Sequence, residues 1–270
     1  MCKQKKVQYD LYKDGFCFLP SLFSKEEIVS AYNGLKDVIN GKYNTGREPE
    51  RRFWEVGDDP NSIIKIDKPH ICNESVWALI TKPKFGRALS KATNSNKIQV
   101  WHSQVVWKPK SKGLSGNAGW HRDAQYWPFW SEKGLYTAWI ALSKVSKYSG
   151  PVRFIPRSNK WENIEELDFF NKNIKTQDKI LDKFFEHRTV VNSTLNIGEV
   201  SIHTSQTYHS SIQNKENSPR VGMVVHFCTE EAQRLSIIGR QKNYLDQLKD
   251  PKTTPVIYDY KNEKNNKKTF

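Results

Sequence analysis

Trp120, His121, Arg122 and Asp123 form the stretch of this 270-residue chain whose side chains most clearly could bind a metal ion. Side chains two apart on a strand point to the same face, so His121 and Asp123 can reach one ion together. A second histidine from elsewhere would complete two histidines and one carboxylate, the ligand set of non-haem Fe(II) oxygenases. A lone His-x-Asp pair often occurs by chance, so this interpretation needs support from the rest of the chain.

Several histidines could supply the remaining ligand, namely His187, His203, His209 and His226. His209 precedes a loop that ends at Pro219, and Arg220 opens the next expected strand. A buried arginine suits an iron site, because its planar guanidinium can hold the distal carboxylate of 2-oxoglutarate in two parallel hydrogen bonds. Taken singly, His209 could equally be a core histidine and Arg220 a surface residue. The two together with the His-x-Asp pair favour the site.

The residues before position 97 predict mainly helices. Ser24 and Glu27 fit a capping box, and apolar residues follow them at helical spacing. Further helix is expected over Ser75–Ala92, divided into two by Pro83.

From Lys97 onward the chain becomes rich in β-forming residues. Strands are expected at Ile98–Trp107, Tyr136–Leu142, Val152–Ile155, Thr189–Leu195, Glu199–Thr204, Tyr208–Gln213 and Arg220–Thr229. A charged, partly helical insertion over Glu162–Lys183 interrupts this series, and Gln233–Leu248 predicts one more helix despite Gly239.

This order of elements predicts an α+β fold, an antiparallel double-stranded β-helix (jelly roll, cupin-like) supported by helices. We expect one domain over 1–270, with helical support over about 1–96, the jelly-roll core over about 97–230, and a C-terminal helix and basic tail over about 231–270. A plain β-sandwich without a site would give much the same pattern.

Over roughly Tyr12–Phe227 the chain resembles the phytanoyl-CoA dioxygenase-like (PhyH-type) branch of the 2-oxoglutarate oxygenases. The resemblance is carried by Asp14-Gly15-Phe16, by Trp120–Asp123, by Thr137–Leu142, by Ser149–Asn159, and by Gly198-Glu199 followed by His203, His209, Asn214, Ser218 and Arg220. Ser149, Arg157 and Asn159 depart from the family's turn motif. Gly222 stands where many relatives in the wider superfamily have serine.

The resemblance implies that His121, Asp123 and His209 bind Fe(II), and that 2-oxoglutarate and O2 are cosubstrates. Arg220, assisted by Ser211, would hold the distal carboxylate of 2-oxoglutarate, and Trp139 would line its pocket. His102 and Gln104 share one strand face, and we expect one of them to bind the C1 carboxylate or the substrate, unless both point outward. Because Asp123 is present, hydroxylation with release of succinate and CO2 is favoured over halogenation.

An aromatic run, Tyr126-Trp127-Pro128-Phe129-Trp130, follows the metal motif directly. Aromatic clusters are more often core than pocket, yet Pro128 and the polar residues after Trp130 indicate a loop. One interpretation is therefore a lid or substrate wall made by Tyr126, Trp127 and Trp130.

Composition limits the wider choice of function. A formal net charge of +14, spread along the chain, favours an anionic partner such as a small-molecule substrate, although solubility alone could explain it. The alternatives are a basic nucleic-acid-binding protein or a metal-binding barrel without redox activity, but no nucleic-acid-binding signature is found.

No apolar run approaches the length of a membrane span and no secretory signal is visible. The scattered cysteines fit a reducing, cytoplasmic compartment. Oligomeric state cannot be read from the sequence.

Overall fold

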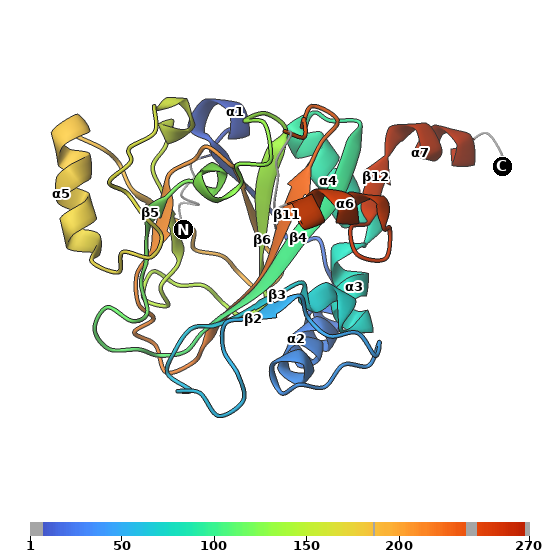
Figure 1. The fold of residues 1–270 in the computed structure, drawn as a ribbon, viewed down its shortest axis with the longest axis horizontal. Helices are drawn as coiled ribbons and strands as arrows, with labels where there is room; N and C mark the ends of the chain where they lie inside the picture. Colours follow the sequence, from blue (N-terminus) through green and yellow to red (C-terminus); the bar gives the residue numbers. More distant parts are fainter. Residues whose placement is uncertain (1–7, 186, 236–241, 268–270) are drawn as a thin grey trace, which may run out of the picture.

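The computed structural model describes residues 8–185, 187–235 and 242–267 (Figure 1). Its frame is a large antiparallel sheet facing a smaller one. The larger sheet has the strand order β1 (Phe16–Leu19), β9 (Val200–Thr204), β6 (Leu135–Ala141), β11 (Arg220–Cys228), β4 (Lys97–Lys108), β3 (Ile64–Asp67), β2 (Arg51–Arg52), with β12 (Val256–Asp259) also paired to β4. The smaller sheet has the order β5 (Ala118–His121), β10 (His209–Ser211), β7 (Val152–Phe154), β8 (Val191–Asn192). This arrangement, with helices outside it, confirms the predicted α+β jelly roll.

The supporting helices lie on the outer face of the larger sheet. Apolar residues of these helices form one buried core with the sheet; the helices are α2 (Lys25–Ile39), α3 (Glu74–Ile80) and α4 (Pro83–Thr93). The capping box is confirmed, since the Glu27 amide donates to Ser24 Oγ at 3.3 Å and the Ser24 amide donates to Glu27 at 2.7 Å. The division at Pro83 is confirmed too.

The remaining helices are short and lie around the two sheets. They are α1 (Leu11–Asp14), α5 (Ile174–Phe184), α6 (Lys242–Asp246) and α7 (Tyr260–Lys267), with 3-10 turns at Pro69–Ile71, Asp123–Tyr126, Ser158–Lys160 and Gln247–Lys249. In Figure 1, α5 stands beside β5 at the edge of the molecule. There Trp120 donates a hydrogen bond from Nε1 to Asp178 at 2.9 Å and packs against Leu181.

Successive side chains of β11 face alternately the hydrophobic core and the space between the two sheets. Val221, Met223 and Val225 pack against the helices. Arg220 and His226, at the opposite phase of the strand, face the space between the two sheets and line a cavity there. A period of two thus assigns apolar residues to the core and polar residues to the interior of the barrel.

Some predicted boundaries were wrong. Strands β1, β2, β3 and β12 lie outside the expected core range of 97–230, yet all join the larger sheet. In the expected strand Thr189–Leu195, only Val191–Asn192 is paired as a strand.

The prediction of a helix over Gln233–Leu248 was also wrong for its first turn. The Ser131 amide donates to the Gln233 carbonyl at 2.8 Å and the Leu235 amide donates to the Phe129 carbonyl at 3.0 Å. The backbone there is therefore bonded to the aromatic loop rather than to itself, and the next described helix is α6 (Lys242–Asp246). Gly239 lies outside the described residues. Within the described part of the chain, no helix is both long and apolar enough to cross a membrane.

Candidate metal centre

Three side chains converge between the two sheets. His121 ends β5, Asp123 begins the 3-10 turn that follows, and His209 starts β10. His121 and His209 are directly paired across the antiparallel strands, which brings their ring centroids to 4.1 Å. The ligand atoms of all three residues lie within 4.8 Å of one another. One metal ion can therefore be bound by all three.

Backbone carbonyls orient both imidazoles. Nδ1 of His121 lies 2.8 Å from the Gly119 carbonyl, and Nδ1 of His209 lies 3.0 Å from the Thr207 carbonyl. Each Nδ1 therefore carries the proton, which leaves each Nε2 as a free electron-pair donor. These Nε2 atoms lie 3.9 Å and 3.7 Å from Asp123 Oδ1.

The protonation states also suit a cation. Burial, and then the neighbouring His121, hold the pKa of His209 well below its usual range, and burial lowers the pKa of His121. Burial alone would raise the pKa of Asp123, but His209 and His203 outweigh it and hold that pKa well below the ordinary value. Two neutral imidazoles and one carboxylate are the donor set that suits ferrous iron in non-haem oxygenases.

The other candidate histidines lie elsewhere. His187 is exposed and is not among the residues whose ligand atoms converge. His203 and His226 are buried beside it, but they contact the outer side of Asp123 and its partner Thr137 rather than joining the ligand atoms.

Arg220 lies next to Lys108, a lysine that the sequence analysis missed. Arg220 on β11 is paired with Lys108 on β4, and both side chains are buried. Nε and Nη1 of Arg220 have no hydrogen-bond partner, and its guanidinium lies 5.1 Å from the centre of the Trp139 ring. Lys108 Nζ donates to Ser211 Oγ at 2.7 Å and to the Ile212 carbonyl at 2.8 Å. Lys108 has the same strand phase as Gln104, and that spacing was the signal that could have identified it.

Burial lowers the pKa of Arg220 to about 10, so the guanidinium stays charged at neutral pH. Burial, and then the positive charge of Arg220, lower the pKa of Lys108 well below its usual range. Arg220 and Lys108 are two buried cationic groups, and Arg220 has donor atoms without hydrogen-bond partners. Both features would be strongly stabilised by a bound anion.

Two cavities meet at the metal cluster, because His121 and Asp123 line both of them. The inner one, of about 130 Å³, is also lined by His209, Arg220, Lys108, Ser211, Trp139 and Gln104. The outer one, of about 240 Å³, is lined by His102, Gln104, Tyr126, Trp127, Lys65, Arg51 and several further aromatic residues. Gln104 thus faces both cavities, whereas His102 faces only the outer one.

Comparison with known proteins gives a direct match to a family. The model of the phytanoyl-CoA dioxygenase (PhyH) family matches residues 11–222, which is most of the chain. The chain belongs to the PhyH family. It is accordingly a non-haem iron, 2-oxoglutarate-dependent dioxygenase, as the resemblance predicted.

Individual relatives of this PhyH protein share low sequence identity with it. Ectoine dioxygenase from Bordetella bronchiseptica is 23% identical, covering 81% of this chain and 73% of that enzyme. Among solved structures, EctD from S. alaskensis with 2-oxoglutarate and 5-hydroxyectoine has a TM-score of 0.62 at 16% identity, covering 86% of this chain and 78% of that one. The carbocyclase SnoK from nogalamycin biosynthesis has a TM-score of 0.64 at 19% identity, covering 88% and 87%. These structures show that the fold is shared.

The aromatic run of this PhyH chain is divided between two environments. Tyr126 and Trp127 line the outer cavity. Trp130 does not line that cavity, and its expected place there was wrong; it packs behind Trp101 and borders a separate surface pocket. The chain turns after Pro128, so successive aromatic rings face different sides of the loop.

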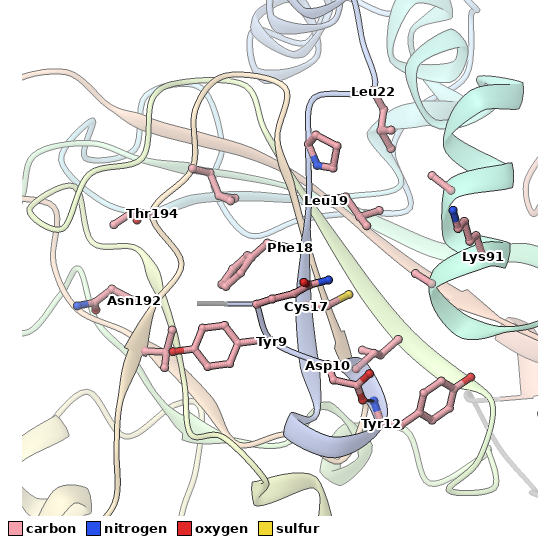
Figure 2. A pocket seen from close by; sticks show the side chains of 17 residues that line it. Tyr9, Asp10, Tyr12, Cys17, Phe18, Leu19, Leu22, Lys91, Asn192 and Thr194 are labelled. Atoms are coloured by element: carbon pink, nitrogen blue, oxygen red, sulfur yellow. Dashed lines mark hydrogen bonds between the residues drawn. The ribbon is translucent and has the colours of Figure 1, made fainter. Parts of the chain in front are cut away.

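A cavity larger than the inner and outer ones lies away from the metal cluster. The pocket has a volume of about 1030 Å³. Figure 2 shows it on both sides of β1, with Leu19 and Lys91 on one side and Phe18, Asn192 and Thr194 on the other. Among its described lining residues there is no histidine, and Asp10 is the sole carboxylate. Volume alone therefore does not locate the reactive centre, whereas the convergence of ligands does.

Proposed function

We propose that this dioxygenase hydroxylates an unactivated C–H bond of a small, anionic molecule bound in the outer cavity, with release of succinate and CO2. One observation carries the assignment of the site: the buried, unpartnered guanidinium of Arg220 opens into the same 130 Å³ cavity as the His121–Asp123–His209 cluster. An anionic cosubstrate that also binds iron would pair with this guanidinium and coordinate the metal held by the cluster.

His121, Asp123 and His209 would hold Fe(II), which supplies the activation of O2 when it is bound. Arg220 and Lys108 would bind the distal carboxylate of 2-oxoglutarate at the closed end of the inner cavity. Ser211 accepts a hydrogen bond from Lys108 and so fixes the direction of its ammonium group. Trp139 covers one face of the guanidinium and excludes water from it.

Gln104 is placed to contact the cosubstrate, the substrate or both, because it borders both cavities. One N–H of its Nε2 already donates to Asp67 Oδ1 at 2.8 Å, which leaves the second N–H for an anionic ligand and the amide oxygen for a donor. His102 also leans toward Asp67, with Nε2 at 3.5 Å from the same oxygen. We assign His102 to the substrate, together with Tyr126 and Trp127.

The anionic character of the substrate follows from two cations at the outer cavity. Lys65 lies 4.9 Å from the ring centre of Phe53 and 5.3 Å from that of Phe169, and burial lowers its pKa. Arg51 lies 4.2 Å from the ring centre of Phe53, at the exposed mouth. Cations held against aromatic faces remain available to an incoming carboxylate or phosphate.

An anaerobic titration of the protein with Fe(II) and then 2-oxoglutarate tests the site. We expect the weak visible charge-transfer band of a chelated 2-oxo acid, and succinate formation once O2 is admitted. Asp123→Ala should abolish both signals. Absence of the band and of succinate in the unsubstituted protein would refute the proposed function.

A panel of matched substrates tests the anionic class. Carboxylated or phosphorylated compounds should stimulate succinate formation more than their neutral amides or alcohols do. Lys65→Met should remove that preference, and equal stimulation by charged and neutral partners would contradict it.

A further inference from the structure

The two oxygens of the Asp123 carboxylate have different surroundings. Oδ1 faces Nε2 of His121 and His209 at 3.9 Å and 3.7 Å. Oδ2 points away from them, accepting a hydrogen bond from Thr137 Oγ1 at 2.6 Å and lying 3.2 Å from His203 Nε2. One oxygen is therefore directed at the metal position, and the other is occupied by protein donors.

The donors to Oδ2 form a row across three neighbouring strands. Thr137 on β6 is paired with His203 on β9 on one side and with His226 on β11 on the other. Because the Thr137 hydroxyl gives its proton to Asp123, its oxygen must accept one from His226 Nδ1, which lies 2.8 Å away. The backbone register of the larger sheet thus brings the three side chains together, and the carboxylate, which can only accept, sets the direction of the hydrogen bonds.

All members of the row are buried, so bulk water has little access to these hydrogen bonds. Burial also keeps His226 neutral, with its pKa lowered to about 3. A neutral His226 with the proton on Nδ1 fits a donor to Thr137, and hydrogen bonds in such a dry environment orient their partners strongly.

We propose that Thr137 and His203 are positioning residues that keep Asp123 a one-oxygen ligand of the iron, with His226 orienting the Thr137 hydroxyl. This inference rests on the proposed iron site. A carboxylate free to rotate could bind through both oxygens, and the second oxygen would take a position that 2-oxoglutarate or O2 needs. Holding Oδ2 against the sheet prevents this and fixes Oδ1 for the metal.

The test compares matched substitutions by metal binding, without need of a substrate. Thr137→Val keeps the shape and removes the hydroxyl, whereas Thr137→Ser restores it; His203→Phe removes the donor, whereas His203→Gln can return an N–H near the Nε2 position. Co(II) and Fe(II) affinities are measured by competition with a chelating dye. Visible absorption of the Co(II) form reports coordination number, because its intensity falls as ligands are added.

We expect Thr137→Val and His203→Phe to bind metal about 10–100-fold more weakly, with weaker Co(II) absorption, and the Ser and Gln variants to recover most of the affinity. Thr93→Val is the control, because Thr93 is a buried threonine of α4 whose hydroxyl bonds only to the Leu89 carbonyl of its own helix. Thermal unfolding of the metal-free proteins shows whether each variant is folded. Should Thr137→Val not fold, the His203 pair makes the same comparison.

Unchanged metal affinity and unchanged Co(II) absorption in folded Thr137→Val and His203→Phe would overturn the positioning role while leaving the iron site standing. Failure of the unsubstituted protein to bind either metal would instead overturn the proposed function and this inference with it.

Discussion

Trp139 occupies the space that a side chain at Gly222 would need: a Cβ built on Gly222 would lie 1.9 Å from Trp139 Cζ2. The two residues belong to neighbouring strands, and Gly222 lies two residues after Arg220. The glycine that departs from the superfamily's serine is thus explained by the large ring beside it. Trp139 instead covers the guanidinium of Arg220.

Gly222→Ser should therefore damage the cosubstrate pocket rather than restore a family contact. We expect a loss of about 1–3 kcal/mol in the free energy of unfolding, because the ring must move, and weaker 2-oxoglutarate binding. Thermal unfolding and calorimetric titration measure the two effects. Adding Trp139→Leu to Gly222→Ser should relieve the clash, and a serine variant as stable as the parent would contradict the assignment.

Arg220→Ala and Lys108→Met should show how much each of the two cationic side chains of the inner cavity contributes to 2-oxoglutarate binding. Loss of one charge from a buried carboxylate contact costs about 2–5 kcal/mol, so the KM for 2-oxoglutarate should rise at least ~30-fold in Arg220→Ala. Lys108→Met keeps the length of the side chain and should raise KM in the same direction. Steady-state succinate formation provides the measurement, and an unchanged KM in either variant would remove that residue from the binding site.

Binding of 2-oxoglutarate should be accompanied by proton uptake. Because burial and Arg220 lower the pKa of Lys108, its ammonium group loses a proton more readily than an exposed lysine does before the ligand binds. A carboxylate placed beside it raises that pKa, so the complex takes up a proton and affinity falls as pH rises. Titration calorimetry in buffers of different ionisation enthalpy measures the uptake. Lys108→Met should abolish it, whereas uptake that persists would show that another group is responsible.

Trp127→Ala should raise succinate formation in the absence of substrate. Trp127 borders the outer cavity and packs edge-on against His226 at 4.9 Å, so its removal admits water to the centre. Trp130→Ala is the matched control, since Trp130 lies outside that cavity. The control should lose stability, by about 3–5 kcal/mol, without this uncoupling. Equal uncoupling in both variants would indicate general loosening of the loop.

The sequence predicted the fold class from local patterns, whereas His209 was chosen among four candidate histidines only through the family resemblance. A period of two described the inward face of β11, but not the metal motif itself, because β5 ends at His121 and Asp123 lies in the 3-10 turn that follows. Lys108 was missed because its partner Arg220 lies on a strand far along the chain, and only sheet register reveals their pairing. The place of Trp130 was wrong for a similar reason, since the path of a loop depends on contacts such as that between Leu235 and Phe129.

The pairing of His121 with His209 links the metal to a sheet of very short strands. Strands β5 and β10 have only four and three residues, so few backbone hydrogen bonds hold them together. An ion bound to both imidazoles would act as a cross-link between these strands and restrain their local opening. Amide hydrogens of the smaller sheet should therefore exchange with solvent more slowly in the iron-loaded protein, while those at the centre of the larger sheet change little.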